Sequence, residues 1–279
     1  LARITVLLSL ATGACHDLAI APYQGKGTGE KSLFRRMYDT LKPGDVVVAD
    51  ALFDEYFSVW ELYKRNIDIV ARAQYERKGS RVSETSPEGD ILVWQRPNKP
   101  RGMTKEQYRN YPKSLVMRQV TVDARDKNNR VTQFKVVTTI LNVSIDGRQI
   151  GNLFERRWEG EVDIRSIKST MQMDILRCKT PDMVHKEIWT HLLAYNLLRT
   201  VMTVAADEND TEPRKVSFKG AKQALTAFAP KIEAARPEDR AQLIDALLTT
   251  IAYHRVGNRP GRWEPRAQKR RPKHAARLT

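Results

Sequence analysis

Hydrophobic positions in the first part of the chain alternate between the two-residue spacing of strands and the three-to-four-residue spacing of helices. Two β-patterned runs joined by a turn at Thr12-Gly13 predict a hairpin, and Pro43-Gly44 ends the helix that follows. The order strand, strand, helix, strand, helix, strand is typical of an α/β fold. The expected elements are strands 4–10 and 14–20, a helix 30–41, a buried strand 46–49 that ends at Asp50, a helix 56–66 and a strand 67–73.

The pattern changes between about residue 74 and residue 148. Charged loops that contain glycine and proline, at 76–89 and 96–102, alternate here with β-patterned runs. The runs cover 90–94, 114–123 and 131–141. This stretch predicts an antiparallel, β-rich insertion between two halves of the α/β core.

The stretch 153–171 is expected to form a helix with an ordered distribution of charge. At about 100° per residue, Phe154, Arg157, Glu161 and Lys168 fall within a wedge of roughly 60°, with Arg165 close beside them. The other side carries an apolar stripe in which a glycine leaves room for a close neighbour. The helix by itself allows two interpretations of this charged face: a solvent-exposed face with Arg–Glu pairs, or a functional site. The stripe consists of Leu153, Gly160, Ile164, Ile167 and Met171.

The carboxyl-terminal part is predicted to be helical. Thr180 is a good N-cap for an apolar helix that continues to about Val204. The acidic stretch 205–214 is the clearest boundary, and helices are expected at 217–228 and 237–254. The chain then becomes dense in Arg and Lys from Arg255 onward, and we expect this tail to be disordered without nucleic acid. A solvated tail and an arm that contacts phosphates are both compatible with its composition.

Composition narrows the class of partner. The chain of 279 residues has a formal net charge of +15 and a pI of about 9.9, as expected of a nucleic-acid binder. Its two cysteines, Cys15 and Cys178, are far apart and have no metal-binding spacing, which favours a reduced cytosolic setting. The apolar start could imitate a signal peptide, but its positive charge is limited to Arg3, so the hairpin is favoured. No apolar run approaches the length that spans a bilayer.

Two segments together carry a resemblance to a known family. The first is the turn and strand of residues 42–53, in which Asp50 follows the strand. The second is the series Phe154, Arg157, Glu161 and Lys168. They resemble the insertion-sequence-4 family of DDE transposases, whose motif is Tyr, two residues, Arg, three residues, Glu, six residues, Lys. The spacing is intact, and Phe154 stands where the family has Tyr. The resemblance implies an RNase-H-like core with a β-rich insertion before the last catalytic helix.

The resemblance also implies roles for individual residues. Asp50 and Glu161 would be catalytic metal ligands, for two Mg²⁺ (or Mn²⁺) ions in the complete enzyme. Such ions clamp the attacking and leaving oxygens of a phosphodiester displacement, and carboxylates suit them as hard ligands. Phe154 has no hydroxyl, so it is carried over as a packing residue. The residues expected to contact phosphate are Arg157, Lys168, Arg165 and Arg72, and for Arg72 a surface ion pair is equally plausible.

One part of the family pattern is not found. The family's first catalytic aspartate lies on the first, central strand, whereas 4–10 and 14–20 correspond to the second and third strands. The first strand is therefore expected to precede Leu1, and Asp17 is not expected to replace its aspartate. Without a strand at that place, backbone groups on the second and fourth strands are left unpaired. We expect an apolar groove and a poorly soluble or marginally folded chain, unless those two strands pair directly.

The leading hypothesis is a DNA transposase, or the carboxyl-terminal part of one, that hydrolyses phosphodiesters and transfers strands at insertion-sequence ends. The alternative is a catalytically incomplete remnant that binds ends without cutting; an RNA-binding protein is disfavoured because no aromatic platform is present. Expected partners are double-stranded DNA and a second copy of the chain, not a membrane, and the expected location is the cytoplasm with the nucleoid. The expected division is a first core half at 1–73, an insertion at 74–148, a second core half at 149–204, a helical region at 205–257 and a basic tail at 258–279.

Overall fold

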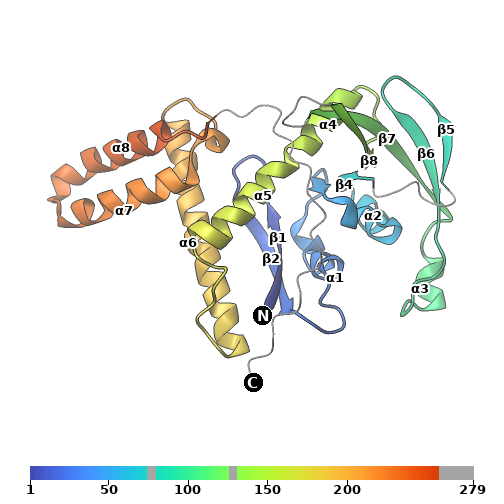
Figure 1. Ribbon diagram of the computed structural model, residues 1–279, viewed down its shortest axis with the longest axis horizontal. Coiled ribbons are helices and arrows are strands. Elements are labelled where there is room, and N and C mark those ends of the chain that lie inside the picture. Colours follow the sequence, from blue (N-terminus) through green and yellow to red (C-terminus); the bar gives the residue numbers. More distant parts are fainter. Residues whose placement is uncertain (74–79, 126–130, 258–279) are drawn as a thin grey trace.

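The computed structural model describes residues 1–73, 80–125 and 131–257, and these form a mixed α/β fold. Two sheets are present in the described chain (Figure 1). A two-stranded sheet is formed by β1 (Ala2–Leu8) and β2 (Cys15–Pro22). A six-stranded sheet has the order β3-β4-β8-β7-β6-β5. Its strands are β3 (Val46–Ala49), β4 (Asp68–Arg72), β5 (Arg81–Glu84), β6 (Asp90–Gln95), β7 (Ser114–Arg125) and β8 (Val131–Thr138).

The six-stranded sheet joins core strands and insertion strands. β3 and β4 pair in parallel, as strands linked by the helix α2 (Tyr56–Tyr63) are expected to do. β8 then pairs antiparallel with β4, and the other insertion strands continue outward from β8. The insertion is therefore antiparallel, as predicted, and extends the core sheet.

Two elements within the insertion were not predicted. β5 lies in the stretch interpreted as a loop at 76–89, and all four of its residues are exposed, so no apolar alternation marks it. The short helix α3 (Lys105–Arg109) likewise has no apolar periodicity, because Tyr108 is its one side chain that packs against the core. Its start is nevertheless encoded, because Thr104 and Gln107 form a capping box.

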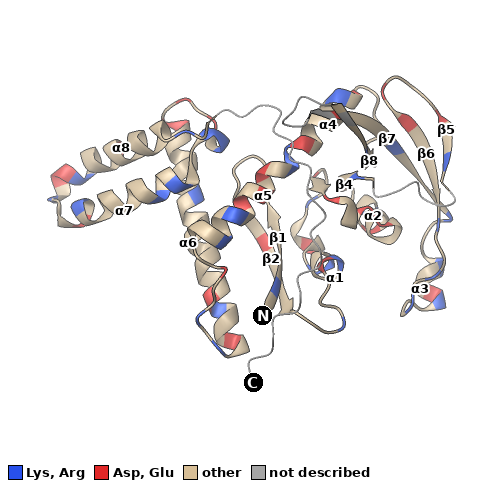
Figure 2. Ribbon diagram, in the orientation of Figure 1, with Lys and Arg blue, Asp and Glu red and all other residues tan. Residues whose placement is uncertain are grey.

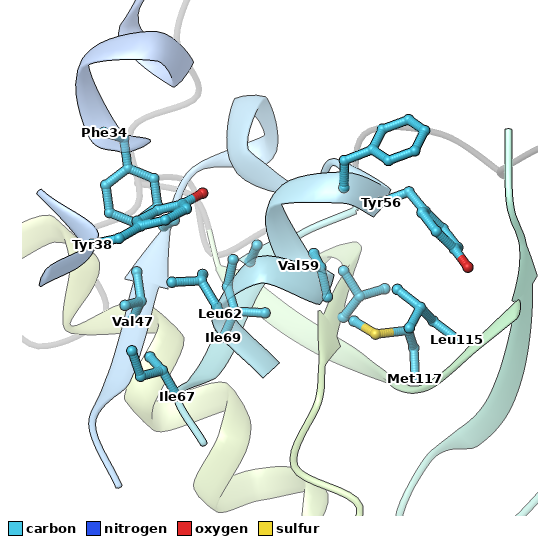
Figure 3. Packing of buried hydrophobic residues seen from close by; sticks show 14 of the residues in the cluster. Phe34, Tyr38, Val47, Tyr56, Val59, Leu62, Ile67, Ile69, Leu115 and Met117 are labelled. Atoms are coloured by element: carbon cyan, nitrogen blue, oxygen red, sulfur yellow. The ribbon is translucent and has the colours of Figure 1, made fainter. Parts of the chain in front are cut away.

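A buried cluster holds one face of the six-stranded sheet against α1 (Glu30–Arg35) and α2. Figure 3 shows side chains of α1, α2, β3 and β4 converging in this cluster, with Leu115 and Met117 of β7 beside them. Phe34 meets the ring of Tyr38 edge to face at 5.0 Å. The predicted helix 30–41 is shorter than expected, since a 3₁₀ turn over Tyr38–Thr40 follows α1.

The predicted single helix 153–171 consists of three pieces. α4 (Gly147–Glu155) begins earlier than expected because Asp146 and Gln149 form a capping box. α5 (Arg157–Arg165) follows a break at Arg156, and a π-helical turn covers Ser166–Thr170. The break separates two sets of contacts, since α4 packs on the six-stranded sheet and α5 reaches toward the hairpin and the carboxyl-terminal helices.

The helix α1 packs against one face of the hairpin β1–β2, and the carboxyl-terminal helices pack against the opposite face. α6 (Pro181–Asp207), α7 (Phe218–Ala234) and α8 (Pro237–Tyr253) form a second buried cluster, with α7 and α8 side by side in Figure 1. α6 extends three residues beyond the expected end at Val204. None of the described helices is long and apolar enough to cross a membrane. The basic tail 258–279 lies outside the described residues.

Candidate functional site

A groove lies between the two sheets, and we call it the inter-sheet groove. Residues 4–10 of the β1 side form one wall and residues 45–50 of the β3 side form another, around a cavity of about 730 Å³. Within the described chain, β1 pairs with β2 alone and β3 with β4 alone, so each presents an unpaired edge. The buried hydroxyl of Thr5 has no hydrogen-bond partner. The expected groove is thus present, and direct pairing of the second and fourth core strands is not.

Asp50 lies at the end of β3, where this strand meets the groove. The side chain is exposed and caps the 3₁₀ turn Ala51–Phe53, because its Oδ1 accepts the amide hydrogen of Leu52 at 3.1 Å. Buried Val47 and Ala49 fix the strand by packing into the core cluster. The sequence predicted this strand with the bounds that the structure has.

The α5 side of the groove carries the charged motif. Arg157 Nη1 donates to Glu161 Oε1 at 2.6 Å, and both side chains are partly exposed, at 29% and 19%. Lys168 is exposed on the π-helical turn and also lines the groove. Leu153, Gly160, Ile164 and Ile167 of the apolar stripe line it as well, so the stripe adjoins the charged face and does not lie on the other side, as the sequence analysis expected. The structure therefore brings Asp50, Arg157, Glu161 and Lys168 to one cavity, although 111 residues separate the two carboxylates.

Other predicted residues lie elsewhere. Arg72 is exposed, with its guanidinium carbon 5.4 Å from the ring centre of Phe134, and Arg165 is exposed on α5; neither lines the groove. Phe154 is buried on α4 with its ring 5.5 Å from that of Phe134, which fits a packing role. Gly160 does not serve a close approach, because a Cβ built there would meet nothing within 4 Å.

Asp17 also lies away from the groove lining. Its Oδ2 accepts the hydroxyl hydrogen of Thr40 at 2.6 Å, and its Oδ1 accepts the amide hydrogen of Leu18 at 2.7 Å. This carboxylate therefore connects β2 to the 3₁₀ turn after α1, as a structural side chain.

A buried charge cluster beside the groove was missed by the sequence reasoning. Asp163 of α5 is fully buried and accepts hydrogen bonds from Arg199 of α6 and from Arg214, the latter at 2.8 and 2.9 Å. Arg214 also donates to the carbonyl oxygens of Ser9 and Leu10 at the hairpin tip. The signal available was an arginine within the otherwise apolar helix around residue 199, which requires a buried acidic partner.

Gly13 explains how the hairpin tip fits against this cluster. A Cβ at this glycine would lie 2.6 Å from Arg214 Nη1, and its φ of +79° is a conformation that other residues rarely adopt. The hydroxyl of Tyr195 donates to the carbonyl oxygen of Gly13 at 2.7 Å. The tip, α5 and α6 are therefore held together by buried polar contacts.

Four carboxylates line the groove, those of Glu30, Asp45, Asp50 and Glu161, and the last two are the ones predicted from the sequence. Mg²⁺ is commonly bound by one or two carboxylates together with water and substrate phosphates, and Asp50 and Glu161 fit that donor set. Arg157 and Lys168 at the same cavity suit the phosphates. Across the described ranges, no three His, Cys, Asp or Glu side chains are grouped so that they could hold a metal by themselves.

Comparison with known proteins agrees with the fold. The family model described as "Transposase DDE domain" matches residues 5–197, a range that includes Asp50, Arg157, Glu161 and Lys168. The chain belongs to this family of DDE transposases. Its similarity extends to the transposase InsG for insertion sequence element IS4 of Escherichia coli, with 33% identity over 129 residues. That match covers 45% of this chain and 29% of InsG, so the chain corresponds to a minor part of that protein's length.

Proposed function

We propose that the inter-sheet groove belongs to the site at which an insertion-sequence transposase hydrolyses and transfers DNA strands. The main support for this proposal is that one cavity is lined by Asp50, at the end of a strand, and by Glu161, on a helix distant in sequence. Arg157 and Lys168 line the same cavity. Two acidic groups for cations and two basic groups for phosphates are the components that phosphodiester chemistry requires. The proposed partner is double-stranded DNA, bound by two copies of the chain.

Each side chain has a distinct task in this proposal. Asp50 and Glu161 would hold Mg²⁺ or Mn²⁺, which would supply charge stabilisation for the attacking and leaving oxygens. Arg157 neutralises Glu161 in the protein alone, and a DNA phosphate competes for its guanidinium. Lys168 adds a flexible point charge along the same backbone. The buried contacts of Asp163 fix the rotation of α5, so that Arg157 and Glu161 remain directed at the groove.

The experiment is a nicking assay on a duplex that contains an insertion-sequence end, with Mg²⁺ or Mn²⁺. We expect Glu161→Gln to lower the nicking rate by roughly 10²–10³-fold, since a group that stabilises transition-state charge is removed. Glu155→Gln is the matched control, because Glu155 is exposed on α4 and outside the groove lining. Nicking that survives Glu161→Gln at the rate of the control would contradict the proposal.

A second candidate is a remnant that binds DNA ends without cutting them. It is favoured because the family's chemistry uses three acidic residues, whereas in the described ranges no three His, Cys, Asp or Glu side chains are grouped so that they could hold a metal. The same assay separates the two candidates. Binding with a steep salt dependence but no metal-dependent nicking supports the remnant, whereas Glu161-dependent nicking excludes it.

A further inference from the structure

An unusually basic surface lies on the insertion, around α3. Residues 96–113 contain six Lys or Arg residues and a single acidic residue, Glu106. Five of the six cations are exposed, and none of the five forms an ion pair with a described acidic residue. We call these five residues the α3 basic surface: Lys99, Arg101, Lys105, Arg109 and Lys113.

The backbone that carries these cations is held in place. The sixth cation, Arg96, lies over the ring of Tyr108 at 4.0 Å and donates to the carbonyl oxygens of Tyr108 and Tyr111 at 2.8 and 2.6 Å. The hydroxyl of Tyr56 donates to the carbonyl oxygen of Pro112 at 2.8 Å. The ring of Tyr111 packs edge to face on Phe57 at 4.9 Å. A ligand would therefore bind without first having to order the segment, which lowers the entropic cost.

The α3 basic surface is separate from the candidate site. No residue of 96–113 lines the inter-sheet groove. Figure 1 shows α3 at the far end of the β6–β7 hairpin, away from α5, and Figure 2 shows basic residues on α3. A duplex in the groove can reach this surface only through its flanking DNA; otherwise a second duplex must bind there.

The chemistry of the surface selects an anionic backbone. None of the exposed large hydrophobic side chains falls within 96–113, so the apolar anchor of a typical protein interface is lacking. Tyr108 and Tyr111 are engaged with Arg96 and Phe57 and pack against the core, so they offer no stacking platform for single strands. Several unpaired cations with little opposing charge are the arrangement that neutralises duplex phosphates.

We propose that the α3 basic surface is a second contact for the phosphodiester backbone of double-stranded DNA, outside the inter-sheet groove. The proposal rests on the proposed function in that it takes DNA as the ligand of the whole protein. The surface binds either the DNA that flanks an occupied groove or a separate target duplex; the phosphate chemistry is the same.

The test measures DNA affinity against NaCl concentration by fluorescence anisotropy, with an end-containing duplex and an unrelated duplex. The variant is Lys105→Gln/Arg109→Gln/Lys113→Gln. Its matched control, Lys64→Gln/Lys215→Gln/Arg236→Gln, removes the same charge from cations that are already paired with Glu61, Glu212 and Asp239. We expect the slope of log affinity against log salt to fall by about 2–3 in the variant and by less than about 1 in the control.

A loss of affinity that is confined to the end-containing duplex supports the proposal and indicates that the surface contacts flanking DNA. An equal loss of affinity for both duplexes supports the proposal and indicates that the surface contacts target DNA. A variant that matches its control in slope and affinity overturns the proposal. Equal thermal unfolding of variant and control by circular dichroism excludes misfolding. Nicking is measured in parallel. If nicking depends on Glu161 but the salt slope of the variant is unchanged, the α3 basic surface is refuted and the proposed function is not. If the salt slope is reduced but nicking does not depend on Glu161, the proposed function is refuted and the α3 basic surface is not.

Discussion

Asp163 shows how one side chain controls the geometry of the groove. It follows Glu161 by two residues, so it faces away from Glu161 on the helix. Burial raises the pKa of its carboxyl, against the opposing effect of the guanidinium groups of Arg199 and Arg214. Two arginines around one acid favour its charged form, and Arg199, itself buried, depends on this partner in turn.

Removal of this carboxylate should therefore destabilise the protein strongly. Asp163→Ala leaves Arg199 buried without its acidic partner, and we expect a loss of about 3–5 kcal/mol in the free energy of unfolding. Urea denaturation followed by circular dichroism measures the change. Asp174→Ala, at an exposed position, is the control and should change stability by less than about 0.5 kcal/mol. Equal effects of the two substitutions would remove the structural role assigned to Asp163.

Cys15 gives a pH-dependent prediction at the same scale. Burial raises the pKa of its thiol to about 11. At pH 8 only about one molecule in a thousand then carries the reactive thiolate. In Cys178→Ser, where Cys15 is the one thiol left, we expect almost no reaction with a disulfide reagent until denaturant is added. Because the folded protein favours the protonated thiol, stability is unaffected below about pH 9 and falls as pH rises toward 11. Rapid labelling of native Cys178→Ser at pH 8 would disprove the burial of Cys15.

Among the described elements, β1 and β3 are edge strands whose backbone groups are unpaired on one side. Both edges face the inter-sheet groove, and unpaired edges are templates for pairing with other chains. Val46, at the start of β3, is 40% exposed and lines the groove, so this edge is also apolar. Poor solubility, which was expected from the sequence, stays a prediction. Its physical cause would be pairing of the unpaired edges of β1 and β3 with other chains.

A charge on this edge should reduce self-association. We expect Val46→Lys to delay the onset of light scattering on heating and to raise the monomer fraction in size-exclusion chromatography. Val143→Lys places the same charge at a residue that is 66% exposed and outside the groove lining. If both substitutions improve solubility equally, net charge and not the β3 edge is responsible.

At the scale of the whole molecule, two connections hold the sheets on either side of the groove: α1 packs with both in one buried cluster, and α4, which packs on the six-stranded sheet, leads into α5. α5 lies over the groove, and its buried aspartate connects it to α6 and to the hairpin tip. The net charge of +15 favours an anionic partner, and the two proposals place DNA at two separate parts of the molecule, the inter-sheet groove and the α3 basic surface.

The sequence by itself determined the α/β class, the strand 46–49 with Asp50 at its end, and the Arg157–Glu161–Lys168 spacing, because periodicity, turn residues and motif spacing are local properties of the chain. The family resemblance implied that Asp50 and Glu161 lie together, whereas the tertiary structure alone decided that the helix 153–171 breaks at Arg156 and that Asp163 meets Arg199 and Arg214. These contacts join residues far apart in sequence, and they depend on how buried surfaces pack, which no local pattern records.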